Sequence, residues 1–131
     1  MLTEKEYCDY DTCVALKEFG YDDSTDLRYN SYGSLGNFLG GVKAPTLYEA
    51  QKWLREEKEV YVTVIPEYNE FGPIKGVKYR LEVAHWKDDE FGYETIEWLD
   101  EECPHTIITF DSYEEALSEG IKEAVNILKK V

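Results

Sequence analysis

The sequence predicts an α+β protein in which helices pack on one face of an antiparallel sheet of three to four strands. Two apolar stripes with helical spacing each follow a capping box, and the segments between them alternate apolar and polar residues as strands do. At 131 residues one domain is expected. Residues 1–44 should supply a helix and a weak, irregular hairpin, and residues 45–131 an α-β-β-β-α core.

The first helix is predicted over residues 11–19, with a start as early as Asp9, because apolar side chains recur at helical spacing and Gly20 suits a C-terminal cap. Residues 27–32 are predicted as a short strand. Residues 33–41 are predicted as a turn and irregular return, since four of these nine residues are glycine.

The second helix should begin at Thr46, which forms a capping box with Glu49, and end near Glu57. The last helix should begin at Asp111 or Ser112, with Glu115 completing a second box, and Gly120 within it indicates close packing on the sheet. Strands are predicted over residues 59–65, 77–86, 93–98 and 106–110. The first of these is expected to be central, because both of its faces are apolar. The predicted core is Trp53, Leu54, Val62, Val64, Leu81, Val83, Leu117, Ile121 and Leu128.

Two sequence patterns resemble a known group of proteins. One is Pro45-Thr46-x-x-x-Ala50-x-Lys52-Trp53-Leu54-Arg55-Glu56, and the other is Ser112-Tyr113-Glu114-Glu115-Ala116 after a strand pair. Together they resemble small uncharacterised proteins of gut Bacteroidetes and their phages or mobile elements. The resemblance covers residues 45–131 best. It implies a biological setting and supplies no catalytic residues.

The net charge of −14 is concentrated in one segment. Between Asp88 and Glu119 the chain has twelve carboxylates and no lysine or arginine. Such a field repels nucleic acid and anionic lipid and attracts a basic protein surface. The helix–three strands–helix order is also that of double-stranded-RNA-binding domains, but Asp111, Glu114 and Glu115 occupy the positions where those domains hold phosphates with lysine. Nucleic acid is therefore not an expected partner.

Other chemistry finds little support in the sequence. Cys103 and His105, with Cys8, Cys13 and His85, lack the close ligand pairs of a structural zinc site. The Asp22-x-Ser24-x-Asp26 stretch lacks the glycine and glutamate of a calcium loop. The glycines of residues 33–41 precede no Lys-Ser/Thr of a phosphate loop. His85 is expected in the core, and no nucleophile–base pair stands out. We therefore predict no enzyme activity, metal or cofactor.

The acidic segment remains the candidate for function. A solvated surface that keeps the protein soluble is its simplest explanation. However, aromatic residues alternate with the acids, as in interface hot spots, which predicts contact with a basic protein. The predicted contact residues are Trp86, Asp88, Asp89, Glu90, Phe91, Tyr93, Trp98, Asp100, Glu101 and Glu102.

Two further hypotheses stay open: an acidic inhibitor that mimics nucleic acid, and a small-molecule site that no motif reveals. The sequence also leaves homo-oligomerisation open. The odd number of cysteines and the lack of a secretion signal predict a cytoplasmic protein. No apolar stretch reaches the ~20 residues of a membrane-spanning helix, so no membrane association is expected.

Overall fold

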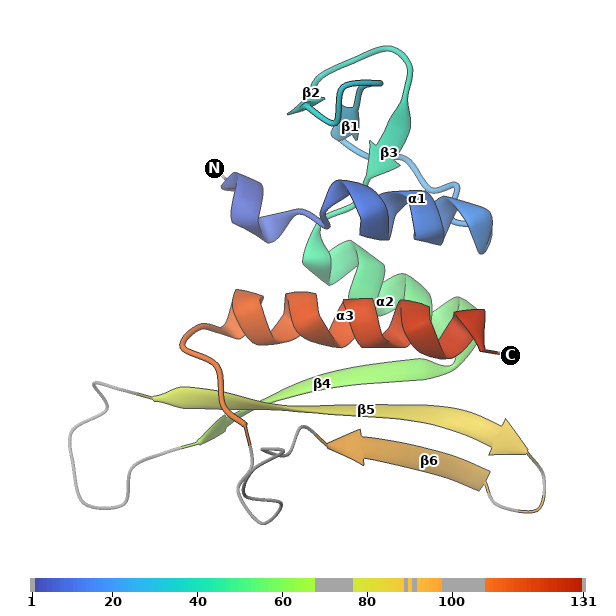
Figure 1. Cartoon of the computed structure of the whole chain (residues 1–131), viewed down its shortest axis with the longest axis vertical. Helices are drawn as coiled ribbons and strands as arrows, with labels where there is room; N and C mark the ends of the chain where they lie inside the picture. The colour runs from blue at the N-terminus through green and yellow to red at the C-terminus, as the bar shows by residue number, and fades with distance from the viewer. Residues whose placement is uncertain (1, 68–76, 89, 91, 98–107, 131) are drawn as a thin grey trace.

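The computed structural model describes residues 2–67, 77–88, 90, 92–97 and 108–130. It confirms the α+β class, with three α-helices and two three-stranded antiparallel sheets along the described chain. Figure 1 shows the elements stacked from the small sheet through the helices to the large sheet. In chain order they are η1 (Glu4–Glu6), α1 (Tyr10–Glu18), β1 (Leu27–Tyr29), β2 (Leu35–Gly36), β3 (Val42–Ala44), α2 (Leu47–Lys58), β4 (Val60–Glu67), β5 (Lys78–Asp88), β6 (Gly92–Glu97) and α3 (Tyr113–Lys129).

The large sheet has the order β4-β5-β6, so the prediction that β4 is central is wrong: β5 is the central strand. Pro66 lies within β4, where it pairs with Tyr79, and proline is confined to edge strands because it cannot donate to the ladder. Helix α2 lies against this edge, and the Gln51 side chain donates a hydrogen bond of 2.8 Å to the Val62 carbonyl oxygen. The apolar side chains on the second face of β4 lie on the open side of the sheet. They do not indicate a strand with a neighbour on each edge.

Helix α3 packs on β4 and β5 and also contacts α2 and α1. Gly120 makes this close approach, because a Cβ atom there would lie 2.7 Å from Leu81 Cδ1 and closer still to Val62 Cγ1. No described helix is long and apolar enough to cross a bilayer. All nine predicted core residues belong to the buried cluster or pack against it: Trp53, Leu54, Val62, Leu81, Val83, Leu117 and Ile121 are buried, and Val64 and Leu128 are partly buried.

The N-terminal part differs from the weak hairpin that the sequence predicted. β1 pairs with β2 and also with β3, which was missed, so the segment is a small sheet of order β2-β1-β3. The Tyr29 hydroxyl donates to the Cys8 carbonyl oxygen over 2.7 Å and ties this sheet to the start of α1.

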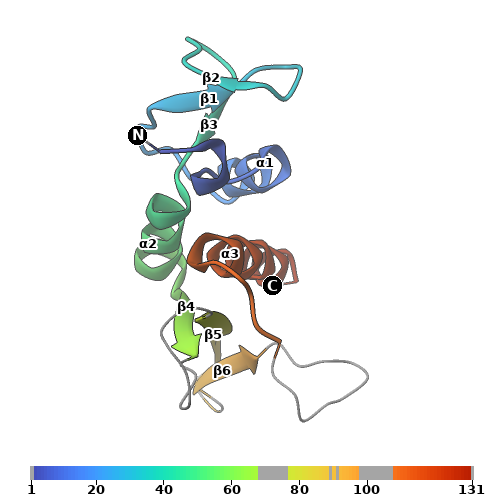
Figure 2. The same cartoon turned by 90° about the vertical axis from the view of Figure 1, so that its left-hand side faces the viewer.

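The helices do not all cover the large sheet. Figure 2 shows α2 and α3 on the same side of it, whereas α1 lies beyond them. Helix α1 packs against β3 and α3. The prediction that helices pack on one face of the sheet therefore does not extend to α1, because the small sheet gives this helix a second surface to cover.

The helix starts follow the predicted caps with one exception. Thr46 and Glu49 form the reciprocal capping box that begins α2, with hydrogen bonds of 3.1 and 2.9 Å. Helix α1 begins at the earlier of the predicted positions, because Asp9 Oδ1 accepts a 2.8 Å bond from the Thr12 amide. At α3 the structure shows only one half of the predicted box, in which the Ser112 hydroxyl accepts a hydrogen bond from the Glu115 amide. The Glu115 side chain lines a cavity instead.

The predicted strand over residues 106–110 is not a strand in its described part. Phe110 makes an isolated bridge to Tyr79 through two backbone hydrogen bonds, of 2.9 and 2.8 Å. This short pairing anchors the start of α3 beside β5, because only two residues separate Phe110 from Tyr113. Residues 106 and 107 lie outside the described residues.

Substituting Gly120 tests the close approach of α3 to the sheet. Gly120→Ala should destabilise the protein by about 1–3 kcal/mol, because overpacking against Val62 and Leu81 outweighs the roughly 1 kcal/mol that alanine contributes to a helix. Urea unfolding measures the change. Asn126→Ala on the exposed face of α3 is the control and should have little effect. If the Gly120→Ala cost persists when Val62 is shortened to alanine, the contact with Val62 is not its cause.

Candidate functional site

Two predicted contact residues come together on the large sheet. Trp86 on β5 and Tyr93 on β6 are cross-strand partners, and their rings meet edge to face with centroids 5.2 Å apart. Of the other predicted contact residues, Glu90 is exposed in the turn between these strands and Asp88 ends β5. The remainder lie outside the described residues: Asp89, Phe91, Trp98, Asp100, Glu101 and Glu102.

Tyr61 on β4 completes an aromatic cluster that sequence reasoning missed. Its ring lies edge to face with that of Tyr93, at a centroid distance of 5.7 Å. Tyr93 is thus held between Tyr61 and Trp86, and this arrangement is favoured for aromatic pairs. We call these three residues the aromatic cluster. The signal that was available is the strand alternation, which places Tyr61 opposite Ala84, two residues before Trp86.

The aromatic cluster lies on the face of the large sheet that is turned away from α3. Val62 and Leu81 contact α3 at Gly120, and successive side chains of a strand point to opposite faces. Tyr61 therefore points away from the helix, and the register places Trp86 and Tyr93 on the same side. Trp86 is 43% exposed and Tyr93 is 50% exposed, whereas Trp53 in the core is 8% exposed.

The carboxylate of Glu59 acts on the aromatic cluster. A hydrogen bond with Tyr61, together with the negative charge of Glu59, raises the pKa of Tyr93. Glu59 adopts a left-handed conformation, with φ of 54°, at the end of α2 and leads directly into β4. The opposite end of the same face is neutralised internally, because Arg80 forms ion pairs with Glu67 at 2.6 Å and Glu82 at 2.9 Å. The face of the large sheet turned away from α3, which we call the open face, therefore has two different ends. At one end charges pair with each other, and at the other the aromatic rings lie near Glu59.

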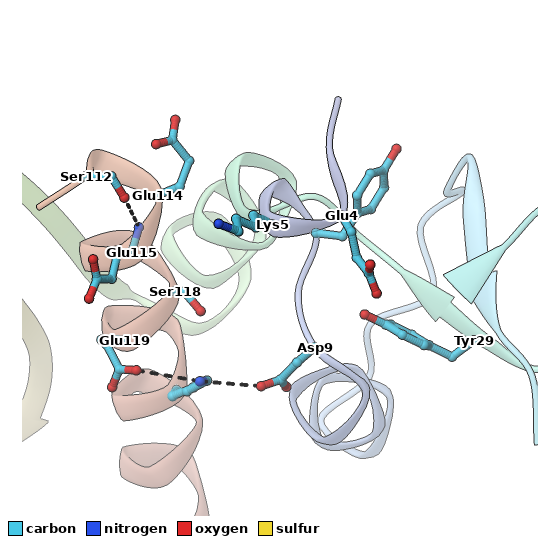
Figure 3. Close-up of a pocket in the computed structure, with 11 residues that line it drawn as sticks. Glu4, Lys5, Asp9, Tyr29, Ser112, Glu114, Glu115, Ser118 and Glu119 are labelled. Carbon is cyan, nitrogen blue, oxygen red and sulfur yellow. Dashed lines mark hydrogen bonds and ion pairs between the residues drawn. The ribbon is translucent and has the colours of Figure 1, made fainter. Parts of the chain in front are cut away.

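A separate cavity lies between η1, the start of α1 and the first half of α3 (Figure 3). Its volume is about 440 Å³. Lys122 crosses it with ion pairs to Asp9 at 3.5 Å and Glu119 at 3.6 Å. The remaining side chains that line it are Glu4, Lys5, Tyr7, Tyr29, Ser112, Glu114, Glu115 and Ser118.

The side chains in this cavity mainly connect α1 with α3. Asp9 caps α1 and pairs with Lys122, so its carboxylate is already used in the fold. Glu114 accepts a 3.0 Å hydrogen bond from the Tyr48 hydroxyl of α2, and burial together with this bond raises the pKa of Tyr48 to about 12. Figure 3 shows the carboxylates spread along the walls without converging on one point.

The cysteine and histidine side chains considered for a zinc site do not gather. Among the described residues, no three His, Cys, Asp or Glu side chains are placed to hold a metal ion. The Cys13 thiol donates to the Cys8 carbonyl oxygen at 3.5 Å, and a hydrogen bond with Cys13 together with burial raises the pKa of Cys8. Both thiols are buried, which suits a structural role. His85 is half-buried on β5, and Cys103 and His105 lie outside the described residues.

Comparison with known proteins adds no family and no structural neighbour. No protein-family model, curated protein or solved structure matches the chain. The aromatic cluster is the best-defined part of the candidate site.

The Asp9 cap gives a pH-dependent prediction. Burial acts to raise the pKa of Asp9, but hydrogen bonds from Thr12 and the charge of Lys122 outweigh it, so the pKa lies below its usual value. A depressed folded pKa stabilises the protein above the unfolded value of about 3.9, and this stabilisation is lost as pH falls through the folded pKa.

Asp9→Ala should therefore lower the free energy of unfolding by about 0.5–2 kcal/mol at pH 7. Asp9→Asn keeps a capping oxygen and removes only the charge, so it should cost less. The difference between Asp9→Asn and the unchanged protein should shrink between pH 5 and pH 3 in urea titrations. A difference that stays constant with pH would show that the Asp9 charge does not contribute.

Proposed function

We propose that this protein is a small, acidic, non-enzymatic accessory protein that acts by binding a basic segment of a partner protein. The contact surface in this proposal is the open face of the large sheet, centred on the aromatic cluster. The observation that carries it is the mutual packing of Tyr61, Trp86 and Tyr93 on an exposed sheet face. The phage or mobile-element setting rests on the sequence resemblance alone.

The aromatic cluster has the composition of an interface hot spot. Tryptophan and tyrosine dominate such spots, because they bury large areas and lose little side-chain entropy. Here the three rings also restrain one another through edge-to-face contacts. A partner would therefore meet a pre-ordered surface, and pre-ordering lowers the entropic cost of binding.

Charge favours a basic partner over a second copy of the chain. With a net charge of −14, two copies repel each other, whereas a lysine- or arginine-rich segment is attracted. Two acids are close in sequence to residues of the cluster. Glu59 directly precedes β4, and Glu90 lies in the turn after β5. Arginine also stacks on exposed aromatic rings, which adds to the attraction at the centre of the surface.

The test compares a cluster variant with a matched surface variant. Trp86→Ala and Tyr93→Ala should each weaken binding of a captured and then purified basic partner by tenfold or more, as hot-spot truncations do. Tyr32→Ala is the control, since Tyr32 is 92% exposed in the turn between β1 and β2. Binding is measured by titration calorimetry, and unfolding midpoints confirm that the variants remain folded.

Other outcomes count against the proposal. A partner that binds the Trp86→Ala and Tyr93→Ala variants as tightly as the unchanged protein uses another surface. A partner that double-stranded DNA displaces from the protein would favour nucleic-acid mimicry. A dimer that Trp86→Ala converts to a monomer would show that the face receives a second copy instead.

A further inference from the structure

A second cavity, of about 220 Å³, lies between α1 and the small sheet. Three cations line it: Lys17 from α1, Arg28 from β1 and Lys43 from β3. Asp22 is the only acid in its wall, and Cys13, Tyr21 and Gly41 complete it. In a protein with twice as many acids as bases, 28 against 14, such a concentration of positive charge is unexpected.

The strand register forces two of these cations together. Arg28 and Lys43 are direct partners in the antiparallel pair of β1 and β3. Like charges directly opposite each other destabilise a sheet. Only Lys43 is compensated, through bonds from its ammonium group to the Asp22 carboxylate at 3.0 Å and the Asp22 carbonyl oxygen at 2.8 Å. Within the described part of the chain, neither the Lys17 ammonium group nor the Arg28 guanidinium group has an ion-pair or hydrogen-bond partner.

The walls of the cavity are fixed by the surrounding structure. Tyr21 is buried and meets the Trp53 ring edge to face, with centroids 5.4 Å apart. Gly41 has a φ of 90°, and a Cβ atom there would collide with the Tyr29 carbonyl oxygen, so β3 can follow this path beside β1 only with glycine. The cations are therefore brought together by rigid elements, which favours ligand binding.

We infer that this cavity binds a small phosphate-bearing ligand. Three cations and one carboxylate leave two positive charges, which match a phosphate dianion. Arginine and lysine are the side chains that bind phosphate, through charge-assisted hydrogen bonds. The volume is below the 300–1,000 Å³ or so of drug-sized ligand sites, so it suits inorganic phosphate or a small monoester, not a nucleotide.

Isothermal titration with inorganic phosphate, at constant ionic strength, tests this inference. The unchanged protein should bind one equivalent saturably. Arg28→Gln should weaken binding about tenfold, as expected for loss of one charge-assisted hydrogen bond, and Lys17→Gln should also weaken it. Arg55→Gln, which removes an exposed arginine of α2, is the matched control and should bind as the unchanged protein does. Glycerol phosphate in a parallel titration distinguishes a monoester from free phosphate.

A stability measurement separates binding from misfolding. In phosphate-free buffer Arg28→Gln should unfold at the same or a higher temperature, because it removes the repulsion with Lys43. Added phosphate should raise the unfolding temperature of the unchanged protein and of Arg55→Gln, but much less that of Arg28→Gln. Absence of saturable phosphate binding, equal binding by Arg28→Gln, or acetate binding as tight as phosphate would each overturn the inference.

Discussion

The close contact between α3 and the large sheet is the constraint on which the rest of the structure depends. Helix α3 is covered on several sides, by β4 and β5, by α2 and by α1. Such a helix needs small residues wherever the side chains of a neighbouring strand come close to its axis. Ala116, Gly120 and Ala124 recur every four residues and so share one face, and at Gly120 there is no room for a methyl group. The large sheet, α2 and α1 all pack against this helix, and the small sheet is placed through α1.

The elements that the sequence predicted well are those whose signals are local. Helices α2 and α3 each begin at a capping residue and carry an apolar stripe, so their starts were found within one or two residues. Of the small sheet, β1 was predicted within residues 27–32 but β3 was missed, because strands of two or three residues carry almost no periodic pattern. Their pairing depends on distant contacts such as that of Tyr29 with Cys8. Pro66 was the local signal that β4 is an edge strand, and the apolar run of valines concealed it.

In the candidate sites, too, the residues with local signals were predicted and those that distant contacts bring together were missed. Trp86 and Tyr93 were predicted as contact residues because they are close in sequence to the acids, and the structure pairs them. Tyr61 was missed because it lies 25 residues before Trp86 and joins the cluster only through the sheet register. The basic cavity was missed for a stronger reason. Lys17, Arg28 and Lys43 are evenly dispersed in sequence, and only the unforeseen strand β3 brings the last two side by side.

The two proposed sites lie toward opposite ends of the stack of layers, with α2 and α3 between them (Figure 1). They also differ in electrostatic character, since one presents aromatic rings near carboxylates and the other gathers cations. At distances beyond about 8–10 Å, salt screens most of the interaction between exposed charges. The overall negative charge can therefore attract a basic protein to the large sheet, while short-range contacts with Arg28 and Lys17 still hold an anion at the small sheet. Because the two sets of residues share no contact that is found among the described residues, changes in one should add to changes in the other instead of altering them.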